Sequence, residues 1–389
     1  MPPGDKYGTS RLMTARVQVP SSIQMCQQCG HIQMETSIDP NYLYSSYLSR
    51  PATTNSNLSD IYVAYAANIK NLAHGGEVLE IGSNDGLFLE HLSKIGVNCS
   101  GIEPALNLHN YAKNIRKVQS INRYFNRDIL EFYTAKKKAL IFANHSISNI
   151  ENIREVGEIV AELLEPTGIF VLQTFYQVEV LKQHLLENYN HEHLSYFTVT
   201  SLAKHFKQFG LEIFDAELIN AKGGSIRCYF QKSQSNSIAT KKLSDNLEGI
   251  LKKEVEFYKN VEKHFMATQD YISLRQYKLS EIFLKYNKNK KIGAFGTSIG
   301  ATVFLSQFEI GGTIDVFFDD DQLRQNLISP LFNIPVLPGN ALNANEYSIC
   351  LITAPLYASR IIEKNMQYLK DGGIFVIFWP EVKIITLDS

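Results

Sequence analysis

The chain has 389 residues and a mass of 44.1 kDa, a length that predicts two or three domains. Hydrophobic residues make up 44% of it and charged residues 20%, which excludes a disordered or fibrous protein. The net charge of −1 and a pI near 6.8 exclude a whole-protein attraction to nucleic acid or to an acidic membrane.

The sequence gives no sign of a membrane span or an export signal. No apolar run approaches the roughly 18 residues that a membrane helix needs. The first twenty residues lack the apolar core of a signal peptide. The five cysteines are too few for a disulfide scaffold in this length, so we expect reduced thiols in a cytoplasmic protein.

Residues 1–60 show no regular period. They contain one Cys-x-x-Cys pair, Cys26 and Cys29, followed by the tyrosine-rich stretch NYLYSSYLS. Residues 61–73 are expected to form a helix.

From residue 77 onward, apolar strand patterns alternate with amphipathic helix patterns. Strands are expected at 77–83, 98–104, 138–145 and 168–176, and helices at 87–96, 105–114 and 151–166. Such alternation with short links requires right-handed crossovers and a parallel sheet. The stretch SIRCYFQK, residues 225–232, closes this region as a late strand.

A second α/β unit follows a polar stretch. Residues 236–290 are rich in Lys and Glu and have a helical period, which predicts a long connecting helix. The second unit starts at KKIGAFGTSIG and continues with the strands IDVFFDDD, YSICLITAP and GIFVIFW. The fold class is therefore α/β, with two Rossmann-like doubly wound units in tandem. The expected domains are residues 1–60, 61–235 and 236–389.

The first glycine loop, EIGSNDG, follows the strand at 77–83 and precedes a helix, and it points to an S-adenosylmethionine (SAM) site. A carboxylate at Glu103, 21 residues beyond Gly82, is placed to accept the hydroxyls of a ribose. The spacing is not that of a dinucleotide loop, and Asp85 suits a cation better than a phosphate. The expected cofactor-binding residues are Glu80, Gly82, Asn84, Asp85, Gly86, Glu103 and Asn144. A glycine corner with no ligand is the alternative.

Five segments together resemble the SAM-dependent sugar C-methyltransferases, from about residue 20 to 385. They are EIGSNDGLFLEHL, GIEPALN, YNHEHLSYF, GGSIR and GAFGTSIGATVFL with VFFDDDQLRQ. The resemblance implies a zinc-binding domain, a SAM domain and a C-terminal Rossmann-like domain. On this basis residues 1–60 are expected to be a truncated zinc-ribbon-like segment with a lid. It also implies methyl transfer to a carbon of a nucleotide-linked, dTDP-type keto-deoxysugar, bound between the last two domains.

Three positions depart from the pattern of that family. The family's zinc site uses two Cys-x-x-Cys pairs, and only Cys26 and Cys29 are present here, so we do not expect structural zinc. Asn190 stands where the family has a tyrosine before HEH, with Tyr189 one position earlier. Ser148 stands where the family has a histidine.

The motif HEHLSYF carries the chemistry that the resemblance implies. A carbon beside a keto group becomes a nucleophile when a base removes its proton and donors stabilise the enolate oxygen. Histidine suits the base because its pKa lies near neutral pH, and His193 matches the family's base position. Glu192, His191 and Tyr189 are the other candidate catalytic residues. A metal at His191 and His193 is an alternative without a recognisable third ligand, so we expect no metal site.

Other motifs suggest substrate contacts. Gly223, Gly224, Ser225 and Arg227 of GGSIR are candidate substrate-binding residues, with Arg227 suited to a diphosphate. Tyr44 and Ser46 are candidate lid residues over SAM, and an ordinary aromatic core segment is the alternative. The loop GAFGTSIG with Asp319 suggests a dinucleotide site by itself, whereas the resemblance implies a wall of the acceptor site.

Three functions stay open at this point. The first is a SAM-dependent sugar C-methyltransferase. The second is an NAD-dependent nucleotide-sugar oxidoreductase that uses the C-terminal unit. The third is an inactive SAM-binding homologue, which Ser148 and Asn190 favour. The expected partner is a nucleotide-linked sugar, with no nucleic acid and no membrane, and the expected state is a monomer or a weak homo-oligomer.

Overall fold

The structure is a computed structural model that describes residues 7–8, 19–44, 56–133, 137–233, 244–287 and 289–388. It divides into two compact units, each assembled from separate stretches of the chain. The unit that we call the central unit comprises residues 23–180 and 192–260. The unit that we call the C-terminal unit comprises residues 1–22, 181–191 and 261–389.

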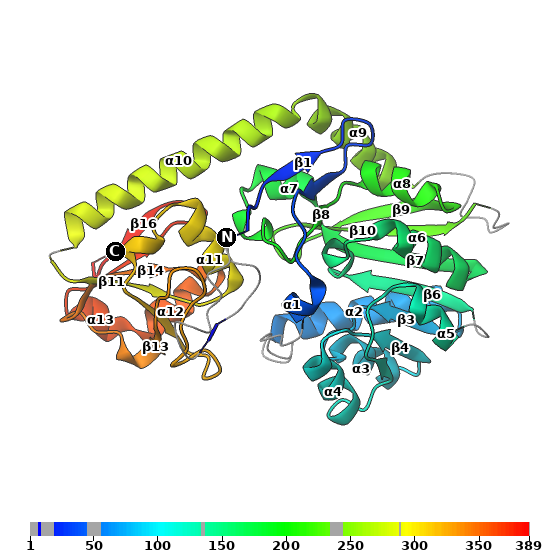
Figure 1. Ribbon diagram of the computed structural model, residues 1–389, viewed down its shortest axis with the longest axis horizontal. Helices are drawn as coiled ribbons and strands as arrows, with labels where there is room; N and C mark the ends of the chain where they lie inside the picture. Colours follow the sequence, from blue (N-terminus) through cyan, green and yellow to red (C-terminus); the bar gives the residue numbers. More distant parts are fainter. Residues whose placement is uncertain are drawn as a thin grey trace. The chain divides into compact units, whose positions relative to one another are not determined.

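A seven-stranded sheet forms the middle of the central unit (Figure 1). Its order is β5-β4-β3-β6-β7-β10-β9, and the first five strands in this order are parallel. The last two, β10 and β9, pair antiparallel. The strands are β3 (Val78–Ile81), β4 (Cys99–Ile102), β5 (Ser120–Ile121), β6 (Lys138–Asn144), β7 (Leu164–Phe175), β9 (Leu211–Ile219) and β10 (Ser225–Lys232). Because the earliest strand lies inside the sheet, the connections leave it in both directions and open a crevice at the carboxyl ends.

Helices pack against both faces of this sheet. They are α2 (Ser56–Ala73), α3 (Leu87–Lys94), α4 (Leu106–Asn114), α5 (Leu130–Tyr133), α6 (Ile153–Leu163), α8 (Val199–Lys207) and α9 (Asp245–Lys259). The short helix α7 (Gln177–Lys182) follows β7 in the chain. Helices α2 and α3 cover the face that carries Phe142 and Val171, and both residues are fully buried in one apolar cluster with them. On the other face, Phe206 of α8 packs against Phe170 and Phe230 at ring distances of 5.3 and 5.0 Å. Because successive side chains of a strand point to opposite faces, the same strands contribute apolar residues to a core on each face of the sheet.

A small antiparallel sheet of three strands, β1-β2-β8, also belongs to the central unit. Strands β1 (Ile23–Met25) and β2 (Ile32–Met34) form a hairpin, and Cys26 and Cys29 lie in its turn region. Strand β8 (Ser195–Tyr196) comes from the motif HEHLSYF and pairs with β2. The N-terminal hairpin therefore holds the residues that directly follow His193.

The C-terminal unit contains a six-stranded sheet of order β13-β12-β11-β14-β15-β16, parallel except for the last pair. Its strands are β11 (Lys291–Phe295), β12 (Val316–Asp319), β13 (Val336–Pro338), β14 (Tyr347–Ile352), β15 (Ile374–Ile377) and β16 (Lys383–Ile385). Its helices include α10 (Val261–Tyr286), α11 (Ile299–Gln307), α12 (Ala358–Lys364) and α13 (Met366–Lys370). Two buried clusters, one around Phe308 and Phe317 and one around Phe318 and Phe375, fill its core.

The predicted fold class is confirmed: the structure is α/β, with two predominantly parallel sheets in tandem. The long connecting helix differs from the expectation, because two helices, α9 and α10, meet at Asn260, whose backbone departs from helical geometry. The edge strands β5, β13 and β16 have two or three residues each, and short segments carry little period in a sequence. Among the described residues, no helix is both long enough and apolar enough to cross a membrane.

One buried carboxylate joins two helices of the central unit. Glu254 of α9 is fully buried and accepts hydrogen bonds from the backbone N–H groups of Val199 and Thr200, both at 2.7 Å. These N–H groups lie in the first turn of α8, where backbone donors have no partner within the helix. The partial positive charge of this helix end also favours a carboxylate.

We predict that Glu254→Leu destabilises the central unit by roughly 2–4 kcal/mol, because it leaves two buried N–H groups without acceptors. Urea unfolding followed by circular dichroism measures the change. Glu256→Leu, on the exposed side of the same helix, is the control and should change the free energy of unfolding by less than about 0.5 kcal/mol. Equal effects of the two substitutions would contradict the role assigned to Glu254.

Candidate active site

A cavity of about 760 Å³ opens at the carboxyl ends of β3, β4 and β6, entirely within the central unit. This volume lies in the range of roughly 300–1,000 Å³ that small-molecule sites occupy. Its lining includes Tyr44, Tyr62, Tyr65, Glu80, Gly82, Asn84, Asp85, Glu103, Asn144, His145, Asn149, Gln173, Phe175, Glu192, His193, Lys222 and Arg227. The ends of neighbouring parallel strands therefore bring polar side chains from distant parts of the sequence into one crevice.

The first glycine loop forms one wall of the cavity. Gly82 has a φ of 73°, which favours glycine, and its N–H donates to the carbonyl oxygen of Ile102 at 2.9 Å. A Cβ at Gly82 would stand 2.4 Å from the Cβ of Ser146. Gly86, with a φ of 76°, precedes α3 and packs against Ala112 and Val118, away from the cavity lining. Both glycines are thus required by the packing of the loop itself.

Glu103 directly follows β4 and faces the cavity. Its Oε2 accepts a hydrogen bond from the N–H of Asn84 at 2.9 Å, and its Oε1 accepts one from the N–H of Ala105 at 2.8 Å. Burial raises the pKa of Glu103 to about 7, although these two N–H groups favour the ionised form. The carboxylate is therefore fixed in orientation, and each oxygen retains capacity for a further donor.

Glu80 and Asn144 lie deeper in the same cavity. Glu80 is 3% exposed, and its Oε1 lies 3.4 Å from the Nδ2 of Asn144. The Oε2 of Glu80 and the Oδ1 of Asn144 are buried and have no hydrogen-bond partner among the described residues. Burial raises the pKa of Glu80 well above its ordinary value. In the ionised form of Glu80, which a bound cation favours, these two buried acceptors suit a ligand that brings several donors, such as an ammonium group.

Asp85 lines the cavity and has a charged partner within the protein. Its carboxylate forms an ion pair with the guanidinium of Arg116 at 2.7 Å, and both side chains are almost fully buried. Arg116 also contacts Glu90 at 2.6 Å. The charge of Asp85 is therefore balanced within the protein, and its expected contact with a cationic ligand stays a prediction.

The predicted lid is described only in part. Tyr44 lines the cavity, and its hydroxyl accepts a hydrogen bond from the Nδ2 of Asn149 at 3.1 Å. Burial raises the pKa of Tyr44, so its hydroxyl stays protonated and can donate. Ser46 lies outside the described residues.

His193 and Glu192 of the motif HEHLSYF both line the cavity. The imidazole of His193 packs against the ring of Phe175, with centroids 5.0 Å apart. The next residue, Leu194, is held on both sides, because its N–H donates to the carbonyl of Ser148 at 2.7 Å and its carbonyl accepts from Met34 at 2.8 Å. Ser148 therefore supports the backbone beside His193 through its main chain.

The other two candidate catalytic residues lie elsewhere. Tyr189 and His191 belong to the C-terminal unit and do not line the cavity. The Nε2–H of His191 donates to the carbonyl of Pro20 at 2.8 Å, which gives this histidine a structural bond. Asn190 is buried, and its amide donates to the carbonyl of Glu187 at 2.9 Å. The structure does not place these side chains with His193 in the cavity, as the sequence suggested.

The motif GGSIR contributes one residue to the cavity lining. Gly223 and Gly224 form a turn with positive φ, and the hydroxyl of Ser225 donates to the carbonyl of Ala221. None of these three lines the cavity, whereas Arg227 does. The guanidinium of Arg227 is already bound within the protein, to Gln173 and Glu217, and lies 3.7 Å above the ring of Tyr65. This geometry does not support the expected diphosphate fork.

Sequence reasoning missed several side chains of the lining, notably Tyr62, Tyr65, His145, Gln173 and Phe175. The last three lie at the ends of β6 and β7, and the position directly after a parallel strand is the signal that could have identified them. Tyr62 and Tyr65 lie on α2, where a tyrosine in an apolar stripe is indistinguishable from an ordinary core residue.

The cavity fits SAM on its own chemistry. Glu103 offers a fixed carboxylate for ribose hydroxyls, while Glu80 and Asn144 offer unpartnered acceptors for an ammonium group. No described basic side chain forms an ion pair with Glu80 or Glu103, so neither carboxyl group has a counter-charge among the described residues.

The glycine loop of the C-terminal unit is held by contacts within the protein. The carboxylate of Asp319 accepts hydrogen bonds from the backbone N–H and the hydroxyl of Thr297. A Cβ at Gly296 would stand 2.7 Å from the Cβ of Ala354. As at Gly82, packing explains the glycine, so its presence alone does not indicate a dinucleotide.

Comparisons with known proteins support methyl transfer to carbon. Residues 57–216 match the family model of a methyltransferase domain, and residues 220–380 match that of a C-methyltransferase C-terminal domain. The chain is 25% identical over 380 residues to the C-methyltransferase NovU of Streptomyces niveus. That alignment covers 95% of this chain and 88% of NovU.

Solved methyltransferases resemble about half of the chain. The CcbJ methyltransferase of Streptomyces caelestis is 16% identical with a TM-score of 0.37, and the match covers 44% of this chain and 89% of CcbJ. The N-methyltransferase NodS of Bradyrhizobium japonicum WM9 is 16% identical with a TM-score of 0.36, over 46% of this chain and 99% of NodS. Because these TM-scores and sequence identities are low, the structural comparisons add no support beyond the two family-model matches.

We predict that SAM binding weakens as the pH falls below about 7, since protonation removes the ionised form of Glu103 that accepts the ribose hydroxyls. The sign follows from the raised pKa: the carboxylate is present above pH 7 and is lost below it. Calorimetry should show the dissociation constant rising by up to about tenfold per pH unit below 7.

Glu103→Ala should weaken SAM binding by roughly 1.5–3 kcal/mol per lost hydrogen bond and should remove much of this pH dependence. Glu131→Ala, an exposed glutamate of the same unit, is the matched control and should behave as wild type. Unchanged affinity in Glu103→Ala would count against the assigned site.

We also predict that the purified protein holds well under one zinc per chain. Cys26 and Cys29 provide two thiolates, which is half of a tetrahedral site, and no group of three or more His, Cys, Asp or Glu side chains suited to a metal occurs among the described residues. Elemental analysis after dialysis against a chelator measures the content. One tightly held zinc per chain would overturn this prediction and would direct attention to His31, two residues beyond the pair.

Proposed function

The chain belongs to the SAM-dependent sugar C-methyltransferase family, and from this premise we propose that it methylates a carbon of a dTDP-linked keto-deoxysugar. The enzyme is a class I C-methyltransferase. The observation that carries the proposal is that His193 lines the same cavity as the two buried carboxylates Glu80 and Glu103. A base and a cation-binding region thus share one cavity.

SAM supplies an electrophilic methyl group on a positively charged sulfur. Glu103 would hold its ribose, and Glu80 with Asn144 would hold its ammonium group. The side chains of Tyr62 and Tyr65 line the same space, and the ring of Tyr65 already carries the guanidinium of Arg227 at 3.7 Å from its centroid. The hydroxyl of Tyr44, which also lines the cavity, can donate or accept a hydrogen bond. These residues bind and orient, and none of them needs to change its covalent state.

His193 is the proposed base. It would take the proton from the sugar carbon beside the keto group, and the electron pair of that C–H bond would pass into an enolate whose oxygen carries the negative charge. Two features support the role. The contact with Phe175 gives the imidazole one apolar neighbour, and the bonds of Leu194 fix the main chain beside it. Glu192, which is 8% exposed and lines the cavity, is the nearest carboxylate in the sequence.

The two positions that depart from the family pattern are compatible with activity. Ser148 is buried in the middle of the short 3-10 helix Ile147–Asn149. Its side chain donates to Asn149 at 2.8 Å, and its carbonyl accepts a hydrogen bond from the N–H of Leu194. Asn190 lies in the C-terminal unit, outside the cavity lining. Neither substitution removes the candidate base or the carboxylates, so an active enzyme is favoured over an inactive binding homologue.

We predict that His193→Asn lowers methyl transfer to a dTDP-linked 4-keto-6-deoxysugar by about 10²–10⁴-fold, because an amide cannot accept the proton. SAM binding should change little, since the proposed cofactor contacts belong to other loops. Two readouts are measured together: transfer of a labelled methyl group, and exchange of the sugar C–H with deuterium from solvent.

The matched control is His74→Asn, which changes an exposed histidine of the same unit and should leave both rates unchanged. Wild-type rates in His193→Asn would show that this histidine is structural. If the wild-type protein neither exchanges nor methylates any of a panel of dTDP-linked and UDP-linked keto sugars, the proposed substrate class is wrong.

A further inference from the structure

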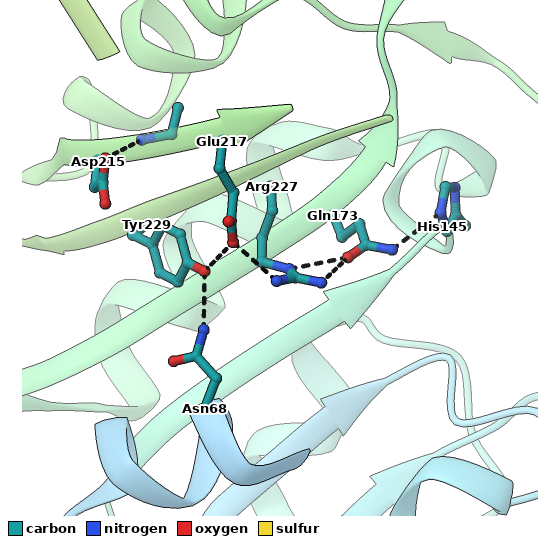
Figure 2. A network of polar contacts seen from close by, with 8 residues as sticks. Asn68, His145, Gln173, Asp215, Glu217, Arg227 and Tyr229 are labelled. Atoms are coloured by element: carbon teal, nitrogen blue, oxygen red, sulfur yellow. Dashed lines mark hydrogen bonds and ion pairs between the residues drawn. The ribbon is translucent and has the colours of Figure 1, made fainter. Parts of the chain in front are cut away.

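His145 stands at the end of a chain of polar side chains that crosses three strands (Figure 2). The guanidinium of Arg227 donates from Nε and Nη2 to the Oε1 of Gln173, at 2.9 and 2.7 Å. Its Nη1 donates to Glu217 at 2.8 Å. At the other end, the Nε2 of Gln173 lies 3.3 Å from the Nε2 of His145. These four residues form what we call the relay.

The register of the sheet places the relay in one row. Gln173 of β7 pairs with Arg227 of β10, and Arg227 pairs with Glu217 of β9. The backbone N–H of His145 donates to the carbonyl of Gln173 at 2.7 Å. The guanidinium of Arg227 also lies 3.7 Å from the ring centroid of Tyr65 on α2, which covers the relay. Each member is therefore held by its strand as well as by its side-chain partners.

The donors and acceptors along the relay determine where His145 carries its proton. A guanidinium has only donors, so the atom of Gln173 that faces Arg227 must be the amide oxygen. The amide nitrogen of Gln173 then faces His145 and donates. The Nε2 of His145 must accept, and a neutral imidazole that accepts at Nε2 carries its hydrogen on Nδ1.

The surroundings keep this imidazole neutral. Burial lowers the pKa of His145 well below its ordinary value, and the neighbouring basic side chains, first among them Lys222, lower it further. A neutral ring has one donor and one acceptor, so the Nδ1–H of His145 is its single donor. This nitrogen is buried and has no hydrogen-bond partner among the described residues.

The position of His145 in the cavity is also suited to contact with a bound substrate. It lines the cavity, and its ring packs against Phe175 at 4.8 Å, on the same phenyl ring that His193 contacts at 5.0 Å. Its φ is 54°, a left-handed conformation that is unfavourable for a residue with a side chain. Strained residues of this kind persist where the surrounding structure fixes them, often at functional sites.

The geometry points to His145 as a second catalytic residue, whose Nδ1–H donates a hydrogen bond to the keto oxygen of the acceptor sugar, with Gln173, Arg227 and Glu217 as positioning residues. This inference rests on the proposed function. In this inference the two histidines that contact the ring of Phe175 have different roles. His193 is the base, and His145 is the hydrogen-bond donor. A neutral imidazole suits the donor role, because its hydrogen bond strengthens as charge develops on the oxygen, and its proton stays on the ring.

The first test needs no substrate. Histidine side chains labelled with ¹⁵N report by NMR which ring nitrogen carries the hydrogen, and the signal of His145 is assigned by its loss in His145→Asn. We expect hydrogen on Nδ1 in the wild-type protein with SAM bound. In Gln173→Glu the new carboxylate accepts from Arg227 and from the histidine, so the hydrogen should move to Nε2 and methyl transfer should fall at least tenfold.

The second test compares variants of His145 in methyl transfer and solvent exchange with a dTDP-linked 4-keto-6-deoxysugar. His145→Leu removes the donor and should lower both rates by about 10²–10³-fold, as for other donors to a developing oxyanion. His145→Asn keeps an N–H near the position of Nδ1 and should retain more activity than His145→Leu. SAM affinity, measured by calorimetry, should be unchanged in both.

The matched control is His74→Leu. His74 is exposed and also has a left-handed backbone, with a φ of 47°, so the same substitution there tests the effect of the backbone alone. A hydrogen on Nε2 in the wild-type protein, or wild-type rates in His145→Leu, would overturn the inference. If the wild-type protein is inactive on every keto sugar, the proposed function fails first, and the donor role fails with it.

Discussion

The site depends on the register of one sheet. Side chains alternate between the two faces of a strand, so a slip of one residue would turn every member of the row to the opposite face. The pairing of β6 with β7 and of β7 with β10 sets Asn144, Gln173 and Arg227 next to one another on the face that α2 covers. The parallel order of β4, β3 and β6 brings Glu103, Glu80 and Asn144 to one edge.

Charge inside the cavity is distributed unevenly, and the pattern separates structural from functional carboxylates. Asp85 is neutralised by Arg116, and Glu217 is bound to Arg227. Glu80 and Glu103 are buried without a basic partner among the described residues, and burial raises the pKa of both. A buried carboxylate without a counter-charge destabilises the empty protein, and such groups concentrate at ligand sites. Glu80 and Glu103 therefore lower the stability of the protein without a ligand, and a bound cationic cofactor would offset this effect.

The fold could be predicted from the sequence because alternating apolar strands and amphipathic helices leave a strong period, and Glu103 could be found because it directly follows a predicted strand. Other features of the site could not be predicted for a shared physical reason: a sequence shows a residue type but not its partner. Asp85 and Arg227 looked available to ligands, yet each is bound to an opposite charge that lies far away in the chain. His145 was overlooked because its significance comes from Gln173, 28 residues later. His191 was misplaced because adjacent residues of a loop can belong to different packed units.

The central claim is that this cavity transfers a methyl group to a carbon atom of a keto sugar. The most direct measurement is to incubate the purified protein with SAM that carries a ¹³C-labelled methyl group and a dTDP-linked 4-keto-6-deoxysugar, and to follow the label by two-dimensional NMR. The account predicts a labelled methyl group coupled to a ring carbon of the sugar. Label bound to oxygen or nitrogen, or label that stays on SAM with every keto sugar tested, would contradict it.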